Sequence, residues 1–203
     1  MRSHKRDELV RKALDIFYRD GFHATGLDRL SDETGISKTT MFRHFRSKDD
    51  LILATMQRRD DGVRAWLRHR MDAAGPPPRA RLMALYDALG EWVAEPGFRS
   101  CLFLRAAAEY PDPAHPIHRL ATEHKRRLAR QVEAVAAEAG AADPGGLSRA
   151  LLLLKDGAAV AAHLGHAEDP VADARAGAEA ILAATLPVAR QHGLPAARTG
   201  APP

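Results

Sequence analysis

Hydrophobic positions recur at helical spacing along almost the whole chain, and alternating strand-like patterns are scarce. Near the N-terminus one apolar stripe consists of Leu9, Val10, Ala13, Leu14 and Phe17. Gly21 follows this stripe and can end the helix. Farther on, the helical patterns are interrupted by proline and glycine at 75–78, 96–97, 111–113 and 144–146. These patterns predict an all-α protein.

Residues 25–45 predict two short helices joined by a glycine turn. Thr25 followed by Asp28 has the form of a capping box, which would start the first helix. Gly35 can adopt the left-handed conformation that ends it, and Ser37 can cap the second helix. Ser47 followed by an acidic residue three positions later repeats the capping pattern, so a longer helix should begin near residue 48.

The second of these short helices has one apolar and one polar face. Because successive helical residues rotate by about 100°, Met41 and Phe45 share the inner face with the stem of Lys38. The opposite face carries only polar side chains, from Thr39, Thr40, Arg43 and His44. The first 48 residues therefore predict a three-helix unit with a helix-turn-helix, the arrangement that places one short helix in the major groove of DNA.

The charge distribution agrees with a DNA-binding role for this unit. The formal net charge of the chain is +4. Residues 1–48 hold 11 Lys and Arg against 7 Asp and Glu, whereas residues 49–203 hold 19 of each kind. The whole positive excess thus lies in the predicted DNA-binding unit. There the Lys and Arg side chains would neutralise DNA phosphates and release the counterions bound to them.

The same residues resemble the TetR family of one-component transcriptional regulators. The resemblance rests on Gly21-Phe22, Thr25, the Gly35-Ile36-Ser37-Lys38 turn, Phe42-Arg43-His44-Phe45 and Ser47-Lys48, and covers about a quarter of the chain. It implies contacts to DNA phosphates or base edges from Thr25, Ser37, Lys38, Thr39, Thr40, Phe42, Arg43, His44 and Lys48. For His44 the alternative is a solvated histidine at a helix end.

Two residues depart from the family pattern. Phe42 stands where the family usually has a tyrosine, so one phosphate contact through a hydroxyl is missing. Thr39 stands where a glycine or small residue is common, and it can offer its methyl group to a thymine or its hydroxyl to a base edge.

The remainder of the chain predicts a larger helical domain. We expect helices at about 48–71, 79–94, 98–109, 116–139, 147–164 and 171–192. The predicted domains are a DNA-binding domain (1–48), an effector-binding and dimerisation domain (49–193) and a disordered tail (194–203) rich in Ala, Pro and Gly.

The last two helices carry broad faces of small and apolar residues that need cover. These residues are Leu151, Leu152, Leu154, Ala158, Ala159 and Ala162, then Gly177, Ala178, Ile181, Leu182, Thr185 and Leu186. A symmetric dimer joined through a four-helix bundle would bury them, and the resemblance implies this interface. The alternative is that the pair packs only on its own core.

A small-molecule effector of unknown identity is the second partner that the resemblance implies, and no cofactor is expected. The candidate lining combines aromatic with polar residues: Trp92, Phe98, Phe103, Arg105, Glu109, Tyr110, Asp156 and His163. For each aromatic residue, ordinary core packing is the alternative.

Asp156 lies in a strongly apolar helix, where burying a lone carboxylate would cost free energy. It should pair with a basic residue, contact a polar ligand or face the dimer partner.

Other classes of function have less support. His115, His118 and His124 lie near Asp112, and His163 precedes His166 by three residues, so a metal-sensing regulator is one alternative. A helical interaction protein without DNA binding is another. Phosphate loops, dinucleotide fingerprints and nucleophile elbows are absent, which argues against an enzyme.

The lone Cys101 and the lack of a long apolar run predict a cytoplasmic, non-membrane protein. We expect a homodimeric repressor that binds a palindromic operator in double-stranded DNA and is released by its effector.

Overall fold

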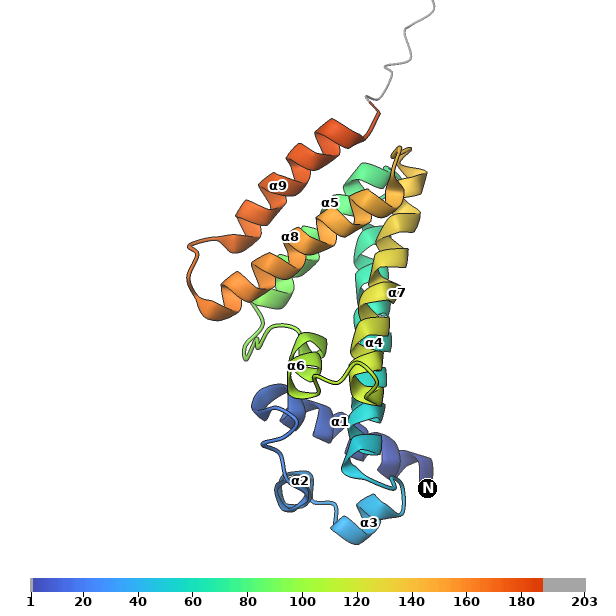
Figure 1. Cartoon of the computed structure of the whole chain (residues 1–203), viewed down its shortest axis with the longest axis vertical. Helices are drawn as coiled ribbons and strands as arrows, with labels where there is room; N and C mark the ends of the chain where they lie inside the picture. The colour runs from blue at the N-terminus through green and yellow to red at the C-terminus, as the bar shows by residue number, and fades with distance from the viewer. Residues whose placement is uncertain (1, 188–203) are drawn as a thin grey trace, which may run out of the picture.

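The computed structural model describes residues 2–187, which form nine α-helices and no strand, as the sequence predicts. Helices α1–α3 lie at one end, α4 and α7 run side by side along the length of the molecule, and α8 and α9 lie at the other end (Figure 1). No helix in this range is both long and apolar enough to cross a membrane. The predicted tail, 194–203, lies outside the described residues. The helices are α1 (Arg2–Asp20), α2 (Leu27–Thr34), α3 (Lys38–Phe42), α4 (Lys48–Ala73), α5 (Pro78–Val93), α6 (Leu102–Glu109), α7 (Pro116–Glu138), α8 (Pro144–Leu164) and α9 (Pro170–Thr185).

Local signals set the boundaries of the first helices. Gly21 and Gly35 both have positive φ, at 90° and 69°, and follow the ends of α1 and α2. Ser37 and Ser47 cap α3 and α4: their hydroxyls accept hydrogen bonds from the backbone N–H groups three residues later, at 3.3 Å and 3.0 Å. The predicted helix-turn-helix unit is therefore present, with α2 and α3 as its two helices.

The predicted capping box at Thr25 is wrong. Helix α2 begins at Leu27, and its N-cap residue, Gly26, makes no side-chain cap. The side chain of Thr25 is fully buried, and its hydroxyl donates to the carbonyl oxygen of Gly21 at 2.6 Å. A buried hydroxyl needs a partner, and the carbonyl groups at the end of α1 have no partner within their own helix. Thr25 therefore closes the turn between α1 and α2 instead of capping α2.

Two hydrophobic cores lie along the molecule. The first packs α1–α3 against the start of α4, and it also includes Phe103 and Ala106 of α6. The second joins α4, α5, α7, α8 and α9. Because α6 contributes to the first core, the helix-turn-helix unit is packed against the larger helical part through more than the continuous helix α4.

Two boundaries differ from the sequence prediction by more than three residues. Helix α6 begins at Leu102 instead of residue 98, because Gly97 and Ser100 have positive φ (81° and 62°). The last helix ends at Thr185, and Leu186 has extended backbone, whereas the prediction ran to residue 192.

Candidate nucleic-acid interface and ligand cavity

Helix α3 lies at the tip of the molecule (Figure 1), and most of its outward side chains are exposed. Met41 and Phe45 are buried against the first core, as the helical periodicity predicts. Among the predicted contact residues, Ser37, Lys38, Thr39, Phe42 and Arg43 are exposed, and Thr40, His44 and Lys48 are half-buried. Phe42 is 51% exposed, so this aromatic ring forms part of the surface and not of the core.

The cations of this surface have different surroundings. Lys38 pairs with Asp28 of α2, but both side chains are largely exposed, so a phosphate can replace that carboxylate at little cost. Arg43 forms no ion pair within the described chain. Burial lowers the pKa of the Lys48 ammonium. Arg46, which the sequence analysis did not single out, is also exposed and bonds to Asp50.

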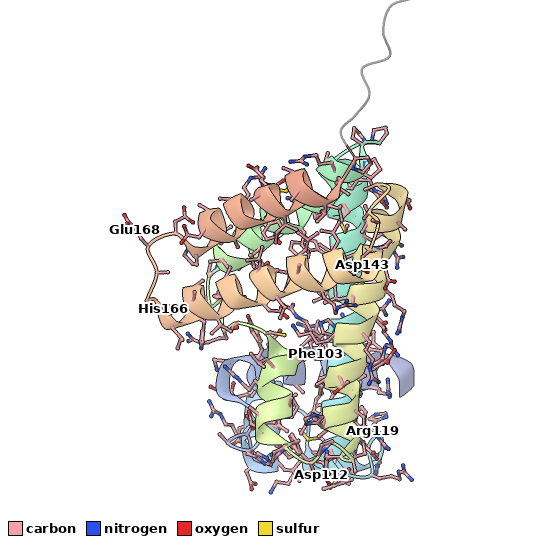
Figure 2. All side chains as sticks on the ribbon, turned by 45° about the horizontal axis from the view of Figure 1, so that its top comes forward. Phe103, Asp112, Arg119, Asp143, His166 and Glu168 are labelled. Carbon is pink, nitrogen blue, oxygen red and sulfur yellow. The ribbon has the colours of Figure 1, made fainter. Side chains whose placement is uncertain are left out.

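A cavity of about 160 Å³ lies between helices α4, α5, α6, α7 and α8. Of the predicted effector residues, Trp92 and Phe103 line it. Figure 2 shows Phe103 on α6, below α8 and beside α7. The lining also includes residues that the sequence analysis missed: Arg59, Gly62, Val63, Trp66, Leu67, Leu85, Ala88, Leu89, Glu95, Cys101, Leu102, His124, Lys125, Leu128 and Lys155.

Phe98 and His163 are placed beside the cavity lining and not on it. The Phe98 ring meets the Trp92 ring edge-on, with centroids 5.0 Å apart. His163 is exposed near the end of α8 and meets the other side of Phe98 at 6.3 Å. These two residues therefore support the wall around Trp92, and the prediction that they line the cavity is not matched by the geometry.

Arg105, Glu109 and Tyr110 face the DNA-binding unit instead of the cavity. Arg105 Nη1 donates to the Tyr18 carbonyl oxygen at 2.9 Å. The Glu109 carboxylate accepts from the backbone N–H groups of Phe22 and His23, and the Tyr110 ring belongs to the first core. The reason is the direction of α6: its first turn reaches the cavity, and its last turn reaches the segment between α1 and α2.

Asp156 is held by two lysines. Its Oδ2 accepts from Lys125 Nζ at 2.6 Å, and its Oδ1 accepts from Lys155 Nζ at 3.3 Å. Burial alone would raise the pKa of Asp156, but the charges and hydrogen bonds of the two lysines lower it. Of the three roles that the sequence left open, the structure shows pairing with basic residues. Both lysines line the cavity, whereas Asp156 lies behind them.

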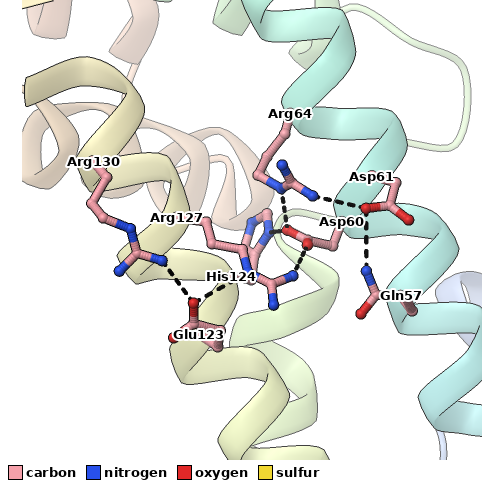
Figure 3. A network of polar contacts seen from close by, with 8 residues as sticks. All are labelled: Gln57, Asp60, Asp61, Arg64, Glu123, His124, Arg127 and Arg130. Atoms are coloured by element: carbon pink, nitrogen blue, oxygen red, sulfur yellow. Dashed lines mark hydrogen bonds and ion pairs between the residues drawn. The ribbon is translucent and has the colours of Figure 1, made fainter. Parts of the chain in front are cut away.

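A buried network of charged groups joins α4 to α7 next to the cavity (Figure 3). The fully buried Asp60 accepts hydrogen bonds from Arg64 Nε at 3.1 Å, His124 Nδ1 at 2.7 Å and Arg127 Nη1 at 2.6 Å. The His124 ring stacks on Phe103 with centroids 3.6 Å apart. Burial lowers the pKa of His124 to about 4, although Asp60 opposes this shift, so the ring is neutral at pH 7 and donates through Nδ1.

The other histidines of the suspected cluster serve different partners. His115 Nδ1 accepts from the backbone N–H of Ile117 and caps α7, and His118 Nδ1 bonds the Tyr110 carbonyl oxygen. Between residues 2 and 187 no group of three His, Cys, Asp or Glu side chains is arranged to hold a metal ion.

Part of the predicted apolar face of α8 and α9 is buried in the protomer, and part of it stays half-buried or exposed. Leu151, Ala158, Ala159, Ala178 and Leu182 are buried within the protomer, so the core accounts for much of the predicted face. The exposed small and apolar positions are Leu153, Gly157 and Leu164 on α8, and Ala172, Ala176, Ala180, Ala183 and Ala184 on α9; Arg149, His163, Asp173, Glu179 and Thr185 are exposed on the same two helices. Leu153 and Leu164 are 75% and 67% exposed.

Comparison with known proteins identifies the family. The family model "Bacterial regulatory proteins, tetR family" matches residues 9–55. A TetR-family transcriptional regulator from Streptomyces coelicolor is 36% identical, with a TM-score of 0.82 and 89% of each chain covered. A putative TetR transcriptional regulator from Streptomyces avermitilis is 30% identical, with a TM-score of 0.69, 86% of this chain covered and 97% of that one.

Two curated relatives match over shorter stretches. The transcriptional regulator YjdC of Escherichia coli is 27% identical over 60% of this chain, and the match spans 63% of YjdC, less than two thirds of its length. The transcriptional activator FasR of Mycolicibacterium smegmatis is 36% identical over 45% of this chain and 42% of its own. The helix-turn-helix, the helical second part and the likeness over nearly the full length to a solved TetR-family regulator agree, and the chain belongs to the TetR family of DNA-binding transcriptional regulators, which are not enzymes.

Proposed function

We propose that this protein acts in the cytoplasm as a homodimer that binds a palindromic operator in double-stranded DNA, represses transcription and is released by a small organic effector. The observation that carries the proposal is the exposed face of α3, where donors and a hydrophobic ring lie on a capped helix. A helix of this kind fits the major groove, and its N-terminal residues then meet the base edges.

Within this proposal the predicted contact residues divide into two groups. Ser37, Lys38, Thr39, Phe42 and Arg43 are exposed and would touch DNA directly, with Thr40, His44 and Lys48 at the edge. Thr25 is buried, so it would position the segment before α2 through its bond to Gly21 and not contact DNA.

A homodimer is supported by the outer face of α8 and α9. Leu153 and Leu164 on α8 are large apolar side chains that are costly to leave in water, and α9 exposes several alanines. Two copies of this pair would bury these side chains in a four-helix bundle, and alanines let helices approach closely. In such a dimer the two α3 helices are related by a two-fold axis and read a palindrome, whose half-site spacing equals their separation.

Release by an effector is supported by the position of the cavity. It touches α4, which follows α3 after the short connection 43–47, and α6, whose last turn is bonded to the turn between α1 and α2. A ligand that moves either helix would change the separation of the two α3 helices, which links the two binding sites.

The first test is selection of fragmented genomic DNA by the purified protein at physiological salt, followed by sequencing of the retained fragments. A shared palindrome is the expected result. Arg43→Ala should lower affinity for that palindrome at least tenfold, because a cation on the α3 surface is lost. Arg126→Ala is the matched control, since Arg126 is exposed on α7. Equal affinity of the two variants, or no enriched sequence even at low salt, would overturn the proposal and favour a helical interaction protein.

Repression is tested separately, because one relative is named an activator. A reporter gene placed behind the selected palindrome should be expressed at a lower level when this protein is present. Higher expression would show activation and would leave the proposed DNA contacts intact.

A further inference from the structure

The polar groups on one side of the cavity are hydrogen-bond donors with an excess of positive charge. Lys125 and Lys155 share the single carboxylate of Asp156, so one of two ammonium charges is left uncompensated. The side chain of Lys155 is only 13% exposed, and its Nζ lies 5.3 Å from the centre of the Trp92 ring. A poorly hydrated excess charge is expensive unless an anion approaches it.

The tryptophan beside Lys155 adds a donor that has no acceptor. Trp92 Nε1 is buried and has no hydrogen-bond partner among the described residues. A buried donor without a partner costs about 1–3 kcal/mol. The indole N–H points outward in the plane of the ring, so a ligand carboxylate would bind Lys155 with one oxygen and accept from Trp92 Nε1 with the other, at the edge of the ring.

The remaining charges on the wall do not cancel this excess. Glu95 lines the cavity, but the residue is also exposed to solvent, so water already stabilises its charge. Arg59 lies over the Tyr18 ring at 5.5 Å and adds a further positive charge. His124 is neutral at pH 7 and has its Nδ1 proton committed to Asp60.

The body of a ligand must be apolar and small. The walls away from the lysines are formed by side chains such as Trp66, Leu89, Leu102, Phe103 and Leu128. The cavity volume is about 160 Å³. An apolar protein cavity of about 150 Å³ holds one benzene molecule. The space therefore fits one aromatic ring, or an aliphatic group of the same size.

We propose that this cavity binds a small organic acid as its carboxylate, with an apolar body of about one aromatic ring and with the carboxylate at Lys125 and Lys155. This inference rests on the proposed function, in which the cavity is the effector site, and adds the chemical class of the effector. The carboxylate would compete with Asp156 for the lysines and so loosen the contact between α7 and α8.

The chain reports on this cavity without a label, because both of its tryptophans, Trp66 and Trp92, line it. Tryptophan fluorescence is titrated with two carboxylates, sodium benzoate and sodium phenylacetate, with benzamide as the neutral analogue of benzoate, and with the cation benzylamine. We expect saturable binding of benzoate at least tenfold tighter than of benzamide, and weakest binding of benzylamine. Equal or tighter binding of benzamide or benzylamine overturns the inference, and so does the lack of saturable binding by benzoate and phenylacetate.

Variants of Lys155 test the position of the carboxylate. Lys155→Met should weaken benzoate at least tenfold and leave benzamide unchanged, whereas Lys155→Arg should keep most of the benzoate affinity. Lys5→Met, an exposed site on α1, is the control. If Lys155→Met unfolds, as judged by circular dichroism, Lys155→Arg and the comparison of the three ligands still decide. An unchanged benzoate affinity in a folded Lys155→Met protein overturns the placement.

The DNA-binding assay separates this inference from the proposed function. If benzoate binds with the expected preference but does not release the operator, the acid-binding site stands and release by this effector is refuted. If the protein binds its operator but none of the acids, regulation of DNA stands and the proposed ligand class is refuted.

Discussion

Replacing Asp60 with asparagine tests whether one buried carboxylate holds α4 to α7 (Figure 3). Asparagine keeps the shape and one acceptor oxygen, but it removes the charge and turns an amide N–H toward donors. The carboxylate is fully buried and accepts from His124, Arg127 and Arg64. The substitution therefore leaves buried donors without an acceptor.

The size of the effect follows from this burial. Removing one member of a buried charge pair costs about 3–5 kcal/mol. The side chains of Arg64 and Arg127 are 23% and 33% exposed, so water can rehydrate them in part, which favours the lower end, about 3 kcal/mol. For a chain of this size, about 1 kcal/mol changes Tm by about 2–4 °C, and Asp60→Asn should lower Tm by roughly 6–12 °C.

Urea unfolding followed by far-UV circular dichroism measures this loss, at a fixed protomer concentration because association would stabilise the folded state. Asp61→Asn is the control: its side chain is 62% exposed and bonds Arg64 and Gln57, so it should cost less than about 1 kcal/mol. A loss below about 1 kcal/mol for Asp60→Asn, or equal losses for the two variants, would refute the described pairing.

The same network predicts how stability depends on pH. Burial lowers the pKa of His124 to about 4, whereas an unfolded chain protonates histidine near pH 6.5. Between these values the unfolded state binds a proton that the folded state does not, so stability falls as the pH falls from 6.5 to 4, by at most about 3 kcal/mol. The pKa of Asp60 is also lowered: burial would raise it, but its hydrogen bonds with His124, Arg64 and Arg127 outweigh burial, which adds a loss at still lower pH. His124→Gln should make the loss between pH 6.5 and 4 smaller, and an unchanged pH profile would contradict the neutral buried ring.

Three further variants test other contacts. Glu109→Gln removes the charge that accepts backbone N–H groups of the turn between α1 and α2, so operator affinity measured by fluorescence anisotropy should fall several-fold; an unchanged affinity would show that this contact does not position α3. Ser47→Ala removes the N-cap of α4 and should cost about 1 kcal/mol in urea unfolding, whereas no loss would mean that water replaces the cap. Leu153→Glu should convert the proposed dimer to monomer in sedimentation equilibrium, whereas Leu104→Glu, 51% exposed on α6, should not; a dimeric Leu153→Glu protein would place the interface elsewhere.

Much of the fold could be predicted because its boundaries depend on local chemistry. Gly35 adopts positive φ, and Ser37 and Ser47 bond groups three residues away, so neighbouring residues are enough to place α3 and the start of α4. The start of α6 could not be predicted from neighbouring residues, because contacts with distant residues set it. The backbone N–H of Arg99 donates to the hydroxyl of Tyr18, 81 residues away, and Ser100 is buried with positive φ.

The α3 surface could be predicted from the sequence more completely than the ligand cavity, again because local chemistry sets one and long-range packing sets the other. The face of α3 comes from one continuous stretch, whereas the cavity is assembled from five helices. Bulk and position in the chain were enough to identify Trp92 and Phe103. The free-energy cost of burying the Asp156 carboxylate left a basic partner, a polar ligand and the dimer partner open, and it could not select Lys125, which reaches Asp156 only when α7 packs on α8.

Glu109 and Phe103 show why α6 has a larger role than the sequence suggested. Phe103 lines the cavity and stacks on His124, whereas Glu109, six residues later, binds the turn between α1 and α2. The eight residues of α6 form a rigid helix, so a displacement at one end is passed to the other. The same His124 bonds Asp60 of α4. A ligand that displaces His124 would therefore act on the DNA-binding unit through α4, to which it is covalently joined, and through α6, which is held to it by hydrogen bonds. In Glu109→Gln the second connection is weakened and the first is intact, so the part of the effector response that this variant loses measures what the Glu109 contact transmits.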